Sequence, residues 1–221
     1  MKRIDKPSPN FEARPANSSI DMLVIHYTGM ASAKAALDQL CDPAAGVSAH
    51  YLIDEDGTLY CLVDETTRAW HAGLSSWRGN SDINDRSIGV ELVNPGHNFG
   101  YRAFPDPQME TAIALAQDIV TRHPIPPRNV VGHSDIAPLR KQDPGELFDW
   151  QRLAAAGVGL WPKPSTKIEA EAAEMLARYG YDISATGTIA AFQRHFRQSE
   201  ISGIADHETA ALAADLLRLI E

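Results

Sequence analysis

An imidazole, an ammonium and a carboxylate lie close together in a Pro/Gly-rich segment of the chain. His133 follows the apolar residues 130–131, and Lys141 and Asp143 come soon after it. A second imidazole, His26, ends another apolar run. Two histidines and one aspartate that project from strand ends would supply three ligands to a zinc ion and leave a fourth position open for water. These residues therefore predict the chemistry of a hydrolytic zinc site.

The remaining histidines give no such indication. The chain holds 8 histidines, and a histidine is more often a surface or hydrogen-bonded core residue than a ligand. Four occur in loop or helical contexts, where an ordinary structural role is expected: His97, His123, His195 and His207. Spacing alone leaves such a role open for His26 and His133 as well.

The elements that must position these side chains alternate along the chain. Short apolar runs predict strands at 22–26, 50–53, 58–63, 87–93 and 130–131. Apolar residues at helical spacing predict helices at 31–40, 107–122 and 147–156. Asp56-Gly57 indicates a hairpin between two of the strands, whereas an irregular arm is expected at 1–20 and a long surface loop at 70–85. Alternating strands and helices predict an α/β fold.

One predicted strand has a clear two-sided pattern. Ile88, Val90 and Leu92 share one face, and Gly89 and Glu91 share the other, because successive side chains of a strand point to opposite sides. Glu91 is therefore expected to point away from the apolar face.

A second, smaller unit is expected near the C-terminus. The Pro-containing segment 163–166 predicts a linker between a first domain at 1–162 and a helical domain at 167–221. Three helices are expected in the second domain, at about 167–179, 187–197 and 206–220. A unit this small buries little apolar surface, so it is expected to lean on the first domain.

Composition and charge disfavour several classes of function. The chain has 20 basic and 29 acidic residues, a formal net charge of −9 and no Lys/Arg cluster, which disfavours nucleic acids and anionic membrane surfaces as partners. Cys41 and Cys61 are expected to be free thiols. The N-terminal residues contain no secretory signal and no run approaches a membrane span. A cytoplasmic location is expected, or a periplasmic one if a signal has been removed.

Five motifs together resemble a known family. They are VIHYT at 24–28, VSAHY at 47–51, AWHAG at 69–73, SIGVEL at 87–92 and the segment 133–145. In this order they are similar to the bacterial zinc-dependent N-acetylmuramoyl-L-alanine amidases, the AmpD/AmiD-like Amidase_2 group related to peptidoglycan recognition proteins. The resemblance covers about residues 20–160 and implies a central mixed β-sheet flanked by helices.

The resemblance also implies roles for five residues. It implies that His26, His133 and Asp143 bind zinc and that Glu91 and Lys141 are the catalytic pair. The aspartate at position 143 resembles the third ligand of the bacterial branch of the family, because active animal and phage-type relatives usually carry a cysteine at that position. Relatives that only bind peptidoglycan tend to lose a ligand or the catalytic pair, whereas all five positions are filled here.

These residue types suit amide hydrolysis. Zinc held by two neutral imidazoles and one carboxylate would lower the pKa of a bound water from about 15.7 towards about 7. Glu91 would take a proton from that water and pass one to the leaving amine. Lys141 would place positive charge against the tetrahedral oxyanion. The bond expected to break joins N-acetylmuramic acid to L-alanine of the stem peptide.

Four further residues are expected to contact the substrate: Trp70, His71, Asn80 and Arg86. Trp70 and His71 open the polar loop, and aromatic faces stack on sugars and peptides, although a core position for Trp70 is equally open. An arginine suits the carboxylates of a stem peptide.

The C-terminal domain resembles the small helical peptidoglycan-binding domain that is often appended to such amidases. The match lies in GTIAAFQ at 187–193 and GIADHET at 203–209. The Gly-rich loop that usually precedes the first of these helices is replaced by SATG at 184–187. Glycan binding and a purely stabilising role therefore both remain open for this domain.

The sequence thus predicts a zinc amidase that acts on peptidoglycan fragments, including anhydromuropeptides, in peptidoglycan recycling or turnover. Two alternatives remain open: a non-catalytic peptidoglycan-recognition module, and a zinc peptidase that cuts within the stem peptide. The missing signal favours a soluble muropeptide as substrate, whereas a wall-binding tail favours the intact polymer. A monomer or weak dimer is expected.

Overall fold

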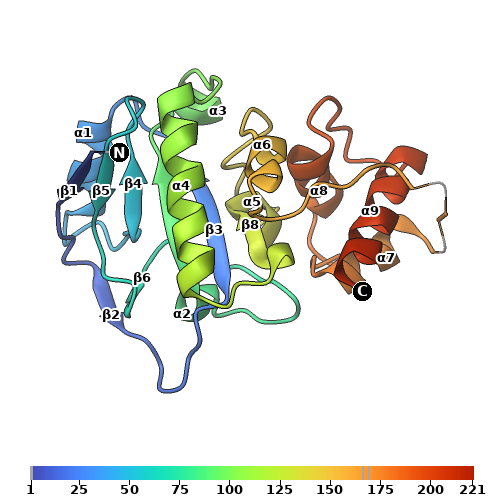
Figure 1. Ribbon diagram of the computed structural model, residues 1–221, viewed down its shortest axis with the longest axis horizontal. Coiled ribbons are helices and arrows are strands. Elements are labelled where there is room, and N and C mark those ends of the chain that lie inside the picture. Colours follow the sequence, from blue (N-terminus) through green and yellow to red (C-terminus); the bar gives the residue numbers. More distant parts are fainter. Residues whose placement is uncertain (1, 166, 169) are drawn as a thin grey trace.

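A six-stranded sheet lies at the centre of the first part of the chain (Figure 1) in the computed structural model, which describes residues 2–165, 167–168 and 170–221. The strands lie side by side in the order β1 (Arg3–Asp5), β5 (Leu59–Cys61), β4 (Tyr51–Ile53), β7 (Ser87–Leu92), β3 (Met22–Tyr27) and β8 (Val130–Gly132). All neighbours are parallel except β4 and β5, which form the predicted hairpin. The predicted α/β fold with a central mixed sheet is confirmed.

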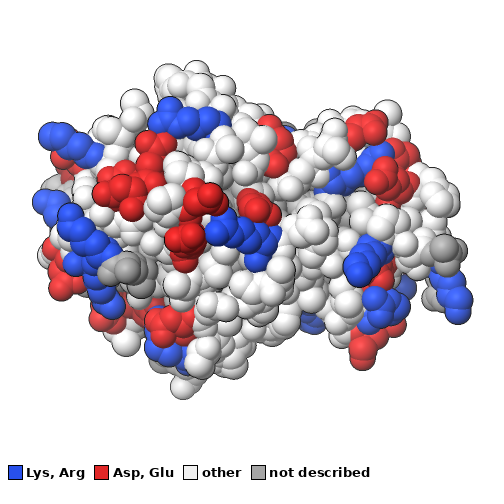
Figure 2. Space-filling model, turned by 45° about the horizontal axis from the view of Figure 1, so that its top comes forward, with Lys and Arg blue, Asp and Glu red and all other residues white. Residues whose placement is uncertain are grey.

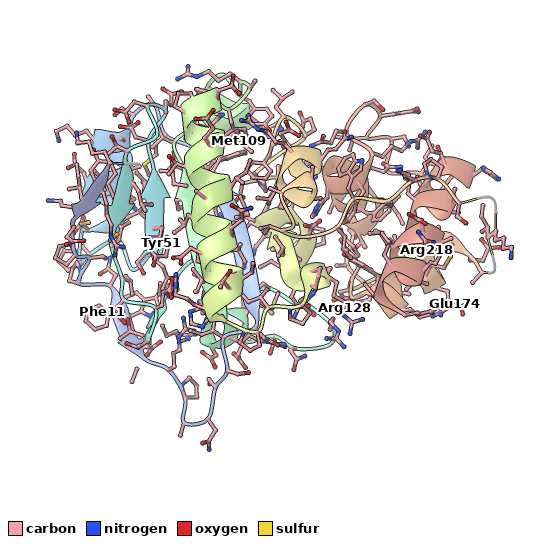
Figure 3. The ribbon with its side chains drawn as sticks, in the orientation of Figure 1. Phe11, Tyr51, Met109, Arg128, Glu174 and Arg218 are labelled. Atoms are coloured by element: carbon pink, nitrogen blue, oxygen red, sulfur yellow. The ribbon has the colours of Figure 1, made fainter. Side chains whose placement is uncertain are left out.

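Helices cover both faces of this sheet. On one face, α4 (Asp106–Arg122) packs on apolar side chains such as Leu23 and Val90. Figure 3 labels Met109 of α4 and Tyr51 of β4, which both belong to this core. On the opposite face, α1 (Ala33–Leu40) packs against Leu52. The alternation of apolar side chains along the strands explains why one sheet has two cores.

The connections contain further short elements. A second sheet pairs β2 (Phe11–Ala13) with β6 (Thr67–Ala69). The described residues also form the short helices α2 (Ile83–Arg86), α3 (Gly96–Phe99), α5 (His133–Ile136) and α6 (Trp150–Ala155), and Pro127–Asn129 form a 3-10 turn.

One expectation about irregular segments was wrong, and a second was incomplete. The arm at 1–20 contains strands β1 and β2, which are largely exposed and have no apolar alternation, so only their backbone bonds to distant strands define them. The expected surface loop at 70–85 is irregular up to residue 82, but it contains Trp77, which is fully buried, and it ends in α2. The indole packs against Tyr179 and Tyr181, which no local sequence pattern reveals.

Three helices form the C-terminal part, as predicted: α7 (Ala172–Tyr179), α8 (Thr188–Phe196) and α9 (His207–Ile220). Helix α7 begins later than expected, and residue 169 of the expected helix lies outside the described residues. The expected linker has no regular structure at 163–165, and residue 166 also lies outside the described residues. The division into two domains at this point stays a prediction.

The C-terminal helices and the central sheet share one hydrophobic core. Val24 and Val131 of the sheet belong to the same buried cluster as Leu176, Phe192 and Leu216 of the helices. This cluster lies on the face of the sheet opposite α4. The expectation that the small helical unit leans on the rest of the chain is confirmed.

The distribution of surface charge and the state of the cysteines agree with the expectations from composition. Figure 2 shows basic side chains interspersed with acidic ones on the face that it presents. Cys41 and Cys61 are free and half-buried, as predicted. Among the described residues, none of the helices combines the length and apolar character needed to cross a membrane.

Candidate metal centre

Adjacent strands bring His26 and Glu91 side by side. His26 near the end of β3 is in register with Glu91 of β7, and register partners on neighbouring strands project to the same face of a sheet. Ile88, Val90 and Leu92 lie in the core under α4, so Glu91 points away from the apolar face, as predicted.

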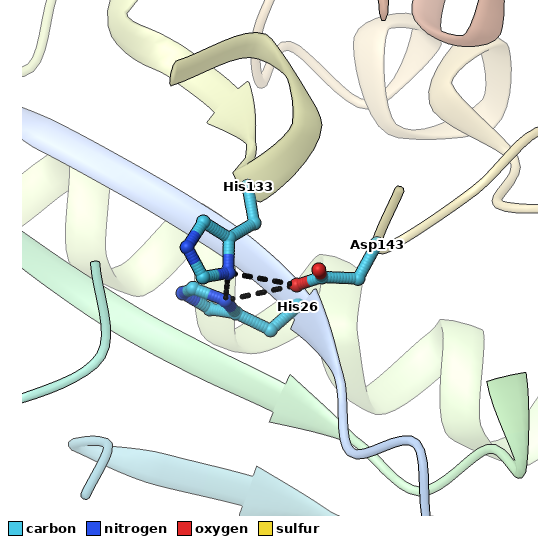
Figure 4. A group of neighbouring side chains, drawn as sticks. All are labelled: His26, His133 and Asp143. Atoms are coloured by element: carbon cyan, nitrogen blue, oxygen red, sulfur yellow. Dashed lines mark hydrogen bonds and ion pairs between the residues drawn. The ribbon is translucent and has the colours of Figure 1, made fainter. Parts of the chain in front are cut away.

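Three candidate ligands meet at this face (Figure 4). His26 Nδ1 lies 2.9 Å from His133 Nδ1, and each nitrogen lies 3.1 Å from Asp143 Oδ2. All three side chains are buried. Ligand atoms about 2.1 Å from a tetrahedral zinc ion lie roughly 3.4 Å apart, so this nearly equilateral triangle matches the spacing of a metal site with a small contraction.

The tautomer of His133 follows from its other ring nitrogen. His133 Nε2 lies 3.1 Å from the carbonyl oxygen of Ala72, which can only accept a hydrogen bond. Nε2 therefore carries the hydrogen, and a neutral His133 presents a lone pair at Nδ1. The guanidinium of Arg140 donates to the same carbonyl and fixes its position.

A longer hydrogen-bond chain assigns the tautomer of His26. The hydroxyl of Ser87 donates to the carbonyl of Ile83 at 2.7 Å, so its oxygen accepts from His71 Nε2 at 3.1 Å. His71 Nδ1 therefore has a lone pair and accepts from His26 Nε2 at 3.0 Å. A neutral His26 consequently also presents a lone pair at Nδ1.

Three electron pairs thus face one another with no hydrogen between them. Burial, aided by the neighbouring His133, lowers the pKa of His26 to about 4, which keeps the ring neutral at pH 7. Two neutral imidazoles and one carboxylate at this spacing fit a divalent cation. The group can hold a metal ion.

A pocket of about 230 Å³ opens over this group. Glu91 and Lys141 line it together with His133 and Asp143. Glu91 Oε2 is buried and has no hydrogen-bond partner. Burial and the charge of Asp143 raise the pKa of Glu91 to about 8, while Lys141 opposes the shift. The carboxyl group of Glu91 and the ammonium group of Lys141 therefore share a pocket with two of the candidate ligands, His133 and Asp143.

The structure divides the four residues predicted to contact substrate. Trp70 and His71 line the same pocket as Glu91, although His71 is also buried against His26. Asn80 and Arg86 lie in a different hollow, where the guanidinium of Arg86 is paired with Asp21. The structure thus brings seven of the nine predicted site residues together and leaves Asn80 and Arg86 apart.

Sequence reasoning missed the residues that orient the histidines. Ser87 and Ala72 lie within two of the five motifs, SIGVEL and AWHAG, but no role was predicted for either residue, because long-range hydrogen bonds leave no local pattern. Gly89 gave the one usable signal, since a glycine within a strand often marks a close approach. A Cβ atom at Gly89 would lie 2.4 Å from Cγ of His71, so only glycine leaves room for this ring.

Comparison with known proteins places the chain among amidases. The family model described as N-acetylmuramoyl-L-alanine amidase, Amidase_2, matches residues 16–146. The chain is 42% identical to N-acetylmuramoyl-L-alanine amidase AmiD of Escherichia coli K12, over 93% of this chain and 85% of that protein. It is 36% identical to 1,6-anhydro-N-acetylmuramyl-L-alanine amidase AmpD of Citrobacter freundii, over 67% of this chain and 87% of that protein.

Solved structures agree over almost the whole chain. The complex of Escherichia coli AmiD with anhydro-N-acetylmuramic acid-L-Ala-D-γ-Glu-L-Lys has a TM-score of 0.83 at 41% identity and covers 94% of this chain and 92% of that one. AmpDh3 of Pseudomonas aeruginosa in complex with anhydromuramic pentapeptide also has a TM-score of 0.83, at 33% identity, and covers 94% and 95%. These matches confirm the family predicted from the five motifs, including its enzyme class. The chain belongs to the Amidase_2 family of N-acetylmuramoyl-L-alanine amidases.

Proposed function

We propose that this protein is a zinc-dependent amidase that hydrolyses the bond between N-acetylmuramic acid and L-alanine in muropeptides, including anhydromuropeptides. Support for the bond comes from the relatives, which are named for this activity. Support for the substrate class comes from the AmiD complex, which holds a muramyl peptide in its anhydro form. The fold of this chain superimposes on that complex over nearly its full length.

One observation carries the proposal. His26 Nδ1, His133 Nδ1 and Asp143 Oδ2 form a triangle of lone-pair donors, and Glu91 projects beside His26 with an unpartnered oxygen. A pure recognition module has no use for a carboxylate with one oxygen buried and unpartnered beside a metal site, because burying a polar atom without a partner destabilises the protein.

The roles follow from position and charge. Zinc, when bound, supplies a Lewis acid that polarises a carbonyl and makes water nucleophilic near neutral pH. Glu91 accepts a proton from the attacking water, since it projects beside His26 with an unpartnered oxygen and a nearby divalent cation favours its ionised form. The protonated Glu91 then delivers that proton to the nitrogen of L-alanine as the amide bond breaks, which gives a free carboxyl group and a free amine.

Lys141 stabilises the negative charge that develops on the carbonyl oxygen. It lines the same pocket as Glu91 and Asp143. A fixed cation of this kind acts mainly on the transition state, because the charge is present only there. The indole of Trp70 on the pocket wall provides an apolar face for the sugar or the peptide. Asn80 and Arg86 have no part in this proposal, since they lie in a separate hollow.

Product analysis of one defined muropeptide tests the proposal. The zinc-loaded protein is incubated with anhydro-N-acetylmuramyl tripeptide, and the products are identified by mass spectrometry. We expect the intact tripeptide and the free anhydro sugar. A shortened peptide would contradict the proposal and show that the protein is a peptidase. Recovery of the unchanged substrate would also contradict it and would leave only a binding function.

Substitution of the base provides the matched control. Glu91→Gln should reduce turnover by at least about 10³-fold while one zinc ion per chain remains bound. Hydrolysis by Glu91→Gln at the wild-type rate would contradict the role given to this carboxylate.

A further inference from the structure

The carboxylate of Asp135 is buried between two parts of the chain. Its side chain receives three donors, each at 2.7 Å: the N–H of Gly132, the hydroxyl of Tyr181 and Nδ1 of His195. Gly132 directly precedes α5, the helix that contains Asp135, whereas Tyr181 and His195 belong to the C-terminal helical region. A carboxylate removed from water depends on such donors. Two of the three partners of Asp135 come from the C-terminal helical region.

Helix α5 connects two of the candidate metal ligands. His133 is its first residue, and the N–H of Ser134 donates to the carbonyl oxygen of Asp143 at 2.8 Å. The third candidate, His26, lies on a separate strand. The orientation of α5 therefore sets where His133 and Asp143 stand relative to His26.

Packing fixes the two donors from the C-terminal region. The ring of His195 is stacked between Trp150 and Phe196, with ring centres 3.7 and 3.8 Å away. Tyr181 meets Trp77 edge-on, with ring centres 5.0 Å apart. Neither donor can turn away from Asp135 without losing these contacts.

Apolar contacts join the same elements. Figure 1 shows α8 beside α5, and Ile136 of α5 belongs to the core cluster that contains Phe192 and Leu216. Close to the end of α5, a Cβ atom at Gly187 would lie 3.0 Å from the carbonyl oxygen of Pro138. The helical region thus contacts α5 along its length and just beyond it.

We propose that the C-terminal helical region fixes the orientation of α5 through hydrogen bonds from Tyr181 and His195 to Asp135. In this way it positions the candidate ligands His133 and Asp143. Tyr181 and His195 are positioning residues, because they reach the site only through α5. The inference rests on the metal site of the proposed function. The helical region would then help to form the active site, whether or not it also binds glycan.

The test compares two Tyr→Phe variants of the full chain. Tyr181→Phe removes the hydroxyl that binds Asp135, whereas Tyr179→Phe removes a hydroxyl from a neighbouring buried ring that does not bond to Asp135. Zinc affinity is measured by competition with a chromophoric chelator. Amide hydrogen exchange of the metal-free proteins is measured for peptides that cover residues 130–137 and, as a reference, β7.

We expect Tyr181→Phe to weaken zinc binding about tenfold and to accelerate exchange around Gly132 while β7 exchanges as before. Tyr179→Phe should leave the zinc affinity and the exchange around Gly132 within about twofold of the wild type. His195→Phe, which keeps a stacked ring but removes the donor, should behave like Tyr181→Phe and replaces it if that variant does not fold.

Wild-type zinc affinity and wild-type exchange in both Tyr181→Phe and His195→Phe would overturn the inference. Equal acceleration in α5 and β7 would also overturn it, since that result marks a general loss of stability. If the wild-type protein bound no zinc, the proposed function would fail, and the exchange measurement would still decide whether the helical region holds α5.

Discussion

His71 Nδ1 lies 3.0 Å from Nε2 of His26, and this contact determines which nitrogen of His26 faces the other candidate ligands. The hydrogen-bond chain continues from His71 to Ser87 and ends at a backbone carbonyl. A metal-bound histidine usually donates its second N–H to such a partner, which orients the ring and fixes its tautomer. The sequence suggested His71 as a substrate contact. In the structure, His71 also accepts a hydrogen bond from the candidate ligand His26.

Replacing His71 should weaken the binding of zinc. His71→Phe removes the acceptor for His26 and should raise the dissociation constant for zinc by about 10- to 100-fold. Competition with a chelator measures this constant. His123→Phe is the matched control, because His123 pairs with Glu65 away from the site. Equal zinc affinities for the two variants would refute the role of His71.

Adding one methyl group at Gly89 should disturb the same contact from the other side. In Gly89→Ala the new Cβ would lie 2.4 Å from Cγ of His71, so either the ring or the central strand must move. We expect a loss of about 1–3 kcal/mol in the free energy of unfolding, measured with urea, together with weaker zinc binding. Unchanged stability and unchanged zinc affinity would show that the ring has more room than the structure indicates.

The base should make the metal-free protein sensitive to pH. The raised pKa of Glu91, about 8, means that the folded state prefers the neutral carboxyl. Its contribution to stability is therefore complete below the ordinary pKa of 4.5 and is lost as the pH rises towards 8. Glu91→Gln has no such loss and should be more stable than the metal-free wild type at pH 8, by about 4 kcal/mol.

Urea unfolding of the two metal-free proteins at pH 5 and pH 8 measures this difference. The two should nearly coincide at pH 5 and separate at pH 8. Zinc should narrow the separation, since a nearby cation favours the ionised carboxylate. A difference between the two proteins that does not change with pH would contradict the raised pKa.

The cation at Lys141 should affect catalysis and leave metal binding intact. Lys141→Met should lower kcat by about 10²–10³-fold, the usual effect of removing one stabilising group from an oxyanion, with one zinc ion per chain retained. Lys34→Met is the control, because Lys34 is exposed and pairs with Asp38 on α1. Steady-state kinetics on the same muropeptide compare them. If Lys141→Met raised KM and left kcat unchanged, Lys141 would be a binding residue.

The sequence predicted the residues of the candidate site better than the residues that hold them in position. His26, His133 and Glu91 follow or occupy apolar strands, and the meeting of parallel strands in register is a general property of sheets, so local patterns and five family motifs were enough. Asp135 and Ser87 were missed, because their partners lie far away in the chain and a buried hydrogen bond has no local signature. Strands β1 and β2 were missed for a related reason, since backbone pairing with distant strands defines them.

The central claim is that His26, His133 and Asp143 hold zinc through Nδ1, Nδ1 and Oδ2. Anomalous diffraction at the zinc edge from crystals of the zinc-loaded protein tests it most directly. We predict one strong peak about 2.0–2.2 Å from all three atoms, with His26 Nε2 still bonded to His71. The absence of a peak between the three side chains, or a metal bound to Nε2 of either histidine, would contradict the claim.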